Sequence, residues 1–170
     1  VYTWDRSWPE IILSHCLFGV VCCGLFACEH ETVHNTAFKS MWLNKSVAFL
    51  AGLFHLYAPT MFRELHFTHH RHTHEPGLDP EISIGGKPMP SIVSNLPYYF
   101  SWVTGLPLLM FKILMLINGA LFMPEFLRKN LHPFVVPKVR FKLAIECLVI
   151  LALHLSFIYL ALYVHEGFWA

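Results

Sequence analysis

Long apolar segments constrain this chain more than any other feature of its sequence. Residues 11–28 are 18 consecutive positions without a formal charge, and residues 143–164 form a longer apolar block with one acid, Glu146, near its start. An 18-residue helix extends about 27 Å, close to the hydrocarbon thickness of a bilayer. Only 14% of the residues are charged and the mean hydropathy is +0.50, whereas soluble domains carry about 25% charged residues. We therefore predict an all-α integral membrane protein, because helices satisfy their own backbone in lipid.

A third apolar block, residues 96–122, is interrupted by Gly105, Pro107 and Lys112. The connections on both sides of it are rich in Lys and Arg, which favours the cytoplasm for each. Both can lie on that side only if the block does not cross the membrane once. We predict two spans, 11–28 and 143–164, and a re-entrant or interfacial segment at 96–122 with Gly105 and Pro107 at its bend. A third true span is the alternative.

The intervening sequence, residues 29–142, then forms a helical cap on the cytoplasmic side. Residues 41–57 are expected to form an interfacial helix or shallow hairpin. Residues 61–74 are expected to form a helix that ends at Pro76-Gly77, and residues 78–90 a loop. No internal repeat divides the chain, so residues 1–170 are predicted to form a single membrane domain. The formal net charge of +1 argues against nucleic acid as a partner.

Histidines in this cap have the spacing of metal ligands. His30 and His34 are four residues apart, so both lie on one face of a helix. His66, His69 and His70 stand at i, i+3 and i+4, which again places them on one face. Histidine is a frequent metal ligand and an expensive residue beside lipid. Five imidazoles exceed the needs of one tetrahedral zinc ion, so they suit two metal ions or one ion of higher coordination, and iron is among the metals that imidazole suits.

These two motifs resemble the first two histidine boxes of the membrane fatty acid desaturase and hydroxylase superfamily. The resemblance extends over about residues 10–165 and includes flanking residues of both boxes: Trp42-Leu43-Asn44, Phe62-Arg63, Arg71-His72-Thr73 and Asp79-Pro80. It implies transmembrane helices with a cytoplasmic cap, and iron ligation by His30, His34, His66, His69 and His70. It also implies a non-haem pair of iron ions, O2 as co-substrate, and introduction of a double bond into a fatty acyl chain.

Other polar residues near the boxes are candidates for supporting roles. His72 and His74 fall on other faces of the predicted helix, so we expect them to support the ligand rings from outside or to be exposed. Glu64, Asp79 and Glu81 are candidates to orient ligand imidazoles through their second ring nitrogens. No catalytic side chain is predicted beyond the metal ligands themselves. The chain contains no flavin or nicotinamide fingerprint, so the resemblance implies an external electron donor, either a ferredoxin or a cytochrome b5.

One part of the family pattern is missing. The third box, another His-x-x-His-His, has no counterpart after His74, where only the isolated His132, His154 and His165 remain. We therefore expect the chain to be part of a longer protein and to be inactive by itself.

Three alternative functions remain open. A hydroxylase or ketolase acting on a lipid, carotenoid or sterol would use the same scaffold. A histidine-rich protein that binds or transports metal would need no catalysis. The segment from His30 to His34 also matches the zinc-protease pattern His-Glu-x-x-His, with Glu31 as general base.

Overall fold

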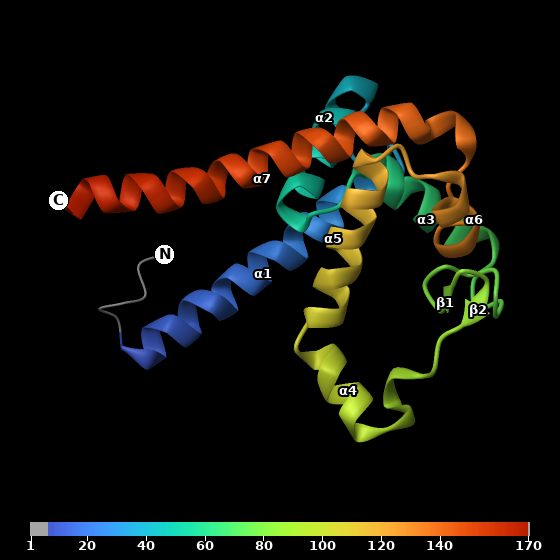
Figure 1. The fold of residues 1–170 in the computed structure, drawn as a ribbon, viewed down its shortest axis with the longest axis horizontal. Helices are drawn as coiled ribbons and strands as arrows, with labels where there is room; N and C mark the ends of the chain where they lie inside the picture. Colours follow the sequence, from blue (N-terminus) through green and yellow to red (C-terminus); the bar gives the residue numbers. More distant parts are fainter. Residues whose placement is uncertain (1–6, 170) are drawn as a thin grey trace. The chain divides into compact units, whose positions relative to one another are not determined.

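The structure is a computed structural model that describes residues 7–169 (Figure 1). Contacts divide the chain into two compact units, residues 1–55 and residues 56–170. The predicted single domain of residues 1–170 also takes in residues 1–6 and 170, which lie outside the described residues. The described part contains seven α-helices and one two-stranded hairpin, which agrees with the predicted all-α class.

The N-terminal unit begins with helix α1, Trp8–Val33. Its start follows from local chemistry, because the backbone N–H and the hydroxyl of Ser7 both donate to Oε2 of Glu10 at 3.0 Å. The helix contains the predicted span 11–28 and is long and apolar enough to cross a bilayer. It continues to Val33, so His30 is carried on the same helix as the apolar segment.

Helix α2, Met41–His55, packs against α1. The buried residues of α2 include the small Ala48, Ala51 and Gly52. At the end of α2, Nε2 of His55 lies 2.8 Å from the carbonyl oxygen of Cys22, and Nδ1 lies 3.4 Å from Oε2 of the buried Glu29. A carbonyl oxygen can only accept, so Nε2 of His55 carries the hydrogen. Of the two alternatives for residues 41–57, a helix or a shallow hairpin, the structure shows a helix that ends at His55, and its interfacial placement stays a prediction.

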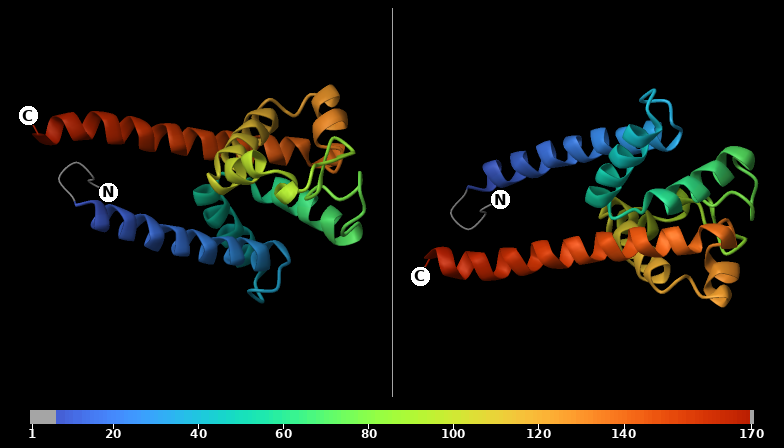
Figure 2. Two further views of the ribbon diagram at one scale, coloured as in Figure 1. Left: turned by 90° about the horizontal axis from the view of Figure 1, so that it is seen from below. Right: turned by 90° about the horizontal axis from the view of Figure 1, so that it is seen from above.

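The C-terminal unit is built on helix α7, Arg140–Trp169, which runs without a break in both views of Figure 2. The second candidate span, Pro137–Leu160, begins just before α7, covers its first two thirds and overlaps the predicted 143–164. One face of α7 is fully buried, and it is formed at helical spacing by Leu143, Ala144, Cys147 and Ile150.

Helix α5, Leu106–Ala120, packs on this face of α7. Gly119 makes the approach possible, since a Cβ there would overlap Sγ of Cys147. Helix α4, Leu96–Val103, precedes α5 and is bent from it by 62°. Gly105 provides the turn with φ of 70°, and Pro107 lies in the first turn of α5. The predicted bend is confirmed, while the choice between a re-entrant segment and a broken span stays a prediction.

Shorter elements lie between the apolar helices. Helix α3, Pro59–Arg71, ends earlier than the predicted 61–74, because the chain leaves helical geometry at His72 and reaches a positive φ at His74. The predicted loop 78–90 contains a hairpin of strands β1, Ser83–Ile84, and β2, Lys87–Pro88. The unit also contains helix α6, Glu125–Leu131. Two 3-10 turns complete it, Ile92–Ser94 and Pro137–Val139.

Candidate metal centre

The first histidine pair lies at the end of α1. His30 is in the last turn of the helix, and His34 follows Val33 with helical backbone angles, so the four-residue relation is kept. The two ring centroids are 4.8 Å apart. Each ring can offer a ligand nitrogen within 4.8 Å of the other. The predicted common face of His30 and His34 is therefore present in the N-terminal unit.

Glu31 fixes the orientation of the first ring. Its Oε1 lies 3.0 Å from Nδ1 of His30, while its Oε2 accepts from the hydroxyl of Thr36 at 2.9 Å. A carboxylate at Nδ1 favours the tautomer that carries hydrogen there, which leaves the Nε2 lone pair for a metal ion. The sequence indicated Glu31 only as the base of the zinc-protease alternative. Its contact with its neighbour was not expected.

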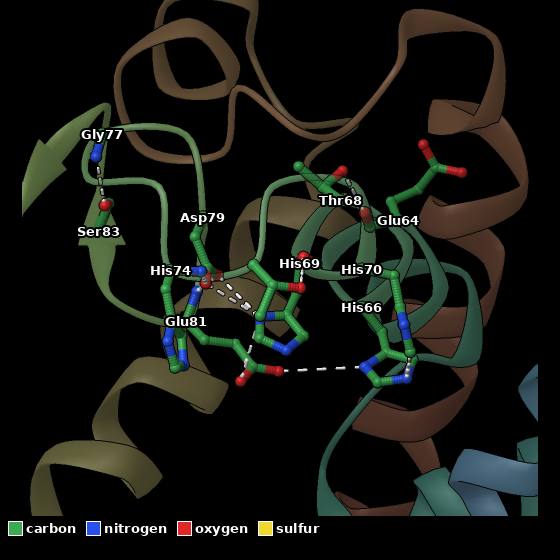
Figure 3. A network of polar contacts seen from close by, with 11 residues as sticks. Glu64, His66, Thr68, His69, His70, His74, Gly77, Asp79, Glu81 and Ser83 are labelled. Carbon is green, nitrogen blue, oxygen red and sulfur yellow. Dashed lines mark hydrogen bonds and ion pairs between the residues drawn. The ribbon is translucent and has the colours of Figure 1, made fainter.

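The second cluster lies on helix α3 and is drawn in Figure 3. Nε2 of His70 lies 2.9 Å from Nε2 of His66, and the ring of His69 is next to both, with centroids 6.2 and 5.9 Å away. The three predicted ligands of α3 thus share one face of that helix. One ring donates to the other at this distance when its Nε2 carries hydrogen. When both Nε2 atoms carry lone pairs the rings repel, and a cation between them removes that repulsion. The donor set therefore fits a metal ion.

A buried carboxylate supports His69 from the loop that follows α3. Asp79 is fully buried, and both of its oxygens lie 3.0 Å from Nδ1 of His69. It also accepts from the backbone N–H groups of His74, at 2.8 Å, and Glu81, at 2.9 Å. Burial alone raises the pKa of Asp79, but the bonds from Glu81, His69 and His74 outweigh it, so the pKa lies below its usual value.

Glu81 extends this support to a second ring. Its Oε2 lies 3.5 Å from Nδ1 of His69, and its Oε1 lies 4.0 Å from Nδ1 of His66 (Figure 3). Both rings therefore turn Nδ1 toward carboxylates and keep Nε2 for another partner. The candidates Asp79 and Glu81 are two residues apart and come from the loop after Pro76-Gly77, so their approach to α3 depends on the turn.

The remaining candidates lie farther from the ring nitrogens. The carboxylate of Glu64 points away from the three imidazoles in Figure 3. Nδ1 of His72 lies 3.3 Å from Oε2 of Glu75. The backbone N–H of His74 donates to Asp79, which in turn contacts His69. Support of the ligand rings by Glu64, His72 and His74 stays a prediction.

Comparisons with known proteins place this geometry in context. A family profile described as "Fatty acid desaturase" matches residues 6–170. A protein named beta-carotene 4-ketolase, from Protosiphon botryoides, is 32% identical over 95 residues. That alignment covers 55% of this chain and 23% of the ketolase, so the chain corresponds to a small part of that relative. No solved structure matches the chain significantly.

Proposed function

The chain belongs to the fatty acid desaturase family, and on that premise we propose that it is part of a membrane-bound, non-haem di-iron oxidoreductase. Its substrates are a fatty acyl chain and O2, and its reaction introduces a double bond. The observation that carries this proposal is the second cluster, where His66 and His70 present Nε2 atoms to each other at 2.9 Å beside the carboxylate-supported His69.

The proposed iron ligands are the five box histidines: His30, His34, His66, His69 and His70. Two iron ions, when bound, supply the reduction of O2 and the removal of hydrogen from an unactivated C–H bond. The role of the chain's own residues is to hold neutral nitrogen donors in place. Asp79 and Glu81 do so by accepting a hydrogen bond from Nδ1–H of His69, and this tautomer keeps Nε2 free of hydrogen.

The surroundings follow from the same premise. The apolar helices α1 and α7 hold the protein in the membrane, where a lipid acyl chain is at hand. The histidines lie on the cytoplasmic side, as the Lys and Arg of both connections favour. Electrons come from a separate ferredoxin or cytochrome b5.

Hydroxylation or ketolation is the second candidate reaction. It is favoured by the ketolase relative, whose similarity covers 95 residues. Both reactions begin with removal of hydrogen from a C–H bond, so the same ligand set serves either one. The position of the substrate then decides whether a second hydrogen is lost or oxygen is gained.

Two measurements on the full-length protein test the proposal. Mass spectrometry of the product distinguishes loss of two hydrogens from gain of oxygen. Metal analysis should find two irons per chain, and His69→Ala should lower both iron content and turnover. His154→Ala is the control, because its ring bonds the carbonyl oxygen of Ile150 within α7 and has no part in the proposed set. Labile zinc or copper in place of iron, with no oxidised product, would favour the metal-binding alternative.

A further inference from the structure

A single acid, Glu146, lies inside the apolar segment of helix α7. It is in the second turn of the helix and within the candidate span Pro137–Leu160. Its side chain is only 13% exposed. An acid at such a place is expensive unless it is well bonded, and it is a candidate for a functional role. The family resemblance and the histidine motifs leave this residue without a task.

Glu146 makes a two-point contact with the start of helix α3. Its Oε2 accepts from the backbone N–H of Thr60 at 2.9 Å, and its Oε1 accepts from the hydroxyl of the same residue at 2.8 Å. Lys142, one turn earlier on α7, places Nζ 3.4 Å from Oε1. Both carboxylate oxygens are thus engaged with one residue of another helix, which fixes direction as well as distance.

This contact replaces a cap that α3 does not have. The residue at its N-cap is Ala58, which offers no side-chain acceptor, and Pro59 has no N–H. The N–H groups at a helix start need an outside acceptor, and a negative charge there also matches the helix dipole. A carboxylate from α7 meets both requirements. The start of α3 is therefore bonded to the membrane-spanning helix.

The same helix carries the second histidine cluster. His66 lies six residues after Thr60, about 9 Å along the helix axis. Met61 and Phe62 are buried between these points, and the ring of Phe62 stacks on that of His66 with centroids 5.1 Å apart. A regular helix transmits a rotation at its start to every later side chain. The contact at Thr60 therefore sets the direction in which the imidazoles of α3 point.

We propose that Glu146 is a positioning residue, which bonds α3 to α7 at Thr60 and thereby holds His66, His69 and His70 in register for metal binding. The part of this proposal that concerns iron rests on the proposed function. The bond between the helices does not, and it can be tested separately.

The test combines hydrogen exchange with an iron titration of the full-length protein in lipid nanodiscs. In Glu146→Ala, backbone amides of residues 60–66 should exchange about tenfold faster, while those of α6 keep their wild-type rates. The affinity for Fe²⁺ should fall about tenfold, as for other residues that support ligands. Glu146→Gln should have a smaller effect, because the amide retains one acceptor oxygen. Thr60→Ser keeps both donors and should behave as wild type.

Ser156→Ala is the matched control on α7. Its hydroxyl donates only to the carbonyl oxygen of Ala152 on the same helix, so exchange and Fe²⁺ affinity should not change. Unchanged exchange at residues 60–66 in Glu146→Ala would overturn the proposal. Faster exchange with unaltered Fe²⁺ affinity would overturn it as well. If the wild-type protein bound no Fe²⁺, the proposed function would fail, and the exchange data would still decide whether the helices are bonded.

Discussion

The two histidine clusters are supported in different ways. The carboxylate next to His30 belongs to the following residue, Glu31, whose side chain is 57% exposed. The carboxylate next to His69 belongs to Asp79, ten residues away. Asp79 is fully buried and also accepts hydrogen bonds from two backbone N–H groups. The first arrangement is local and open to solvent. The second depends on a folded loop, so it should hold its ring more tightly and tolerate less change.

Removal of a ring from the second cluster should have the largest effect. His66→Ala should weaken Fe²⁺ binding by more than about 100-fold, because even residues that only support ligands change metal affinity by about 10–100-fold. Isothermal titration in nanodiscs measures this. His15→Ala is the control, since that ring bonds the carbonyl oxygen of Ile11 within α1. Equal losses of Fe²⁺ affinity in both variants would show that the α3 cluster is not the metal site.

The comparison itself is tested by exchanging each carboxylate for its amide. Asp79→Asn should lower Fe²⁺ affinity about 10–100-fold, because it disturbs a buried acceptor of three hydrogen bonds. Glu31→Gln should lower it by less than about threefold, because an exposed contact contributes little. Competition with a chelator measures both values. Similar losses would show that burial of the carboxylate does not distinguish the clusters.

Acid should destabilise the C-terminal unit through a residue outside both clusters. His132 is buried, and burial lowers its pKa from 6.5 to about 4. Between these values the unfolded chain binds a proton that the folded chain does not, so stability falls as the pH drops from 6.5 to about 4 and levels off below. The full loss is about 3 kcal/mol. Thermal unfolding in detergent should show this slope, and His132→Gln should flatten it. Parallel curves for the two proteins would contradict the prediction.

Substitutions of two glycines should have the smallest effects. They compare the C-terminal unit, which contains Gly119, with the N-terminal unit, which contains Gly24. Gly119→Ala should lower the free energy of unfolding by about 1–3 kcal/mol, because the new methyl group meets Cys147 on α7. Gly24→Ala on α1 should raise it by up to about 1 kcal/mol, because nothing lies within 4 Å of its Cβ position and alanine favours helix. Chemical unfolding in detergent measures both. Stabilisation in both variants would show that α5 and α7 separate easily.

Much of the fold could be predicted because its signals are local. The apolar blocks predicted α1 and α7, and Gly105 with Pro107 predicted the bend before α5. The shared faces of His30 with His34, and of His66 with His69 and His70, follow from helical spacing alone. A helix end was placed less well, since α3 stops at Arg71 when the prediction extended it to His74.

The contacts that hold these elements could not be predicted. His55 bonds the carbonyl oxygen of a residue 33 positions earlier, and Thr60 bonds a carboxylate 86 positions later. No periodicity links such residues, so one sequence gives no signal for the pairs. Asp79 was a candidate, but its burial and its two backbone bonds depend on a turn that only the fold reveals.

The bonds of Asp79 have a consequence for protein engineering. They join the ring of His69 to the amides of His74 and Glu81, so the stretch from 69 to 81 is closed on itself and its length is fixed. Deletions or insertions there would separate the ring of His69 from its acceptor. An exposed side chain of this stretch, such as Leu78 at 56% exposure, gives a place to attach a reporter group while the number of residues stays the same.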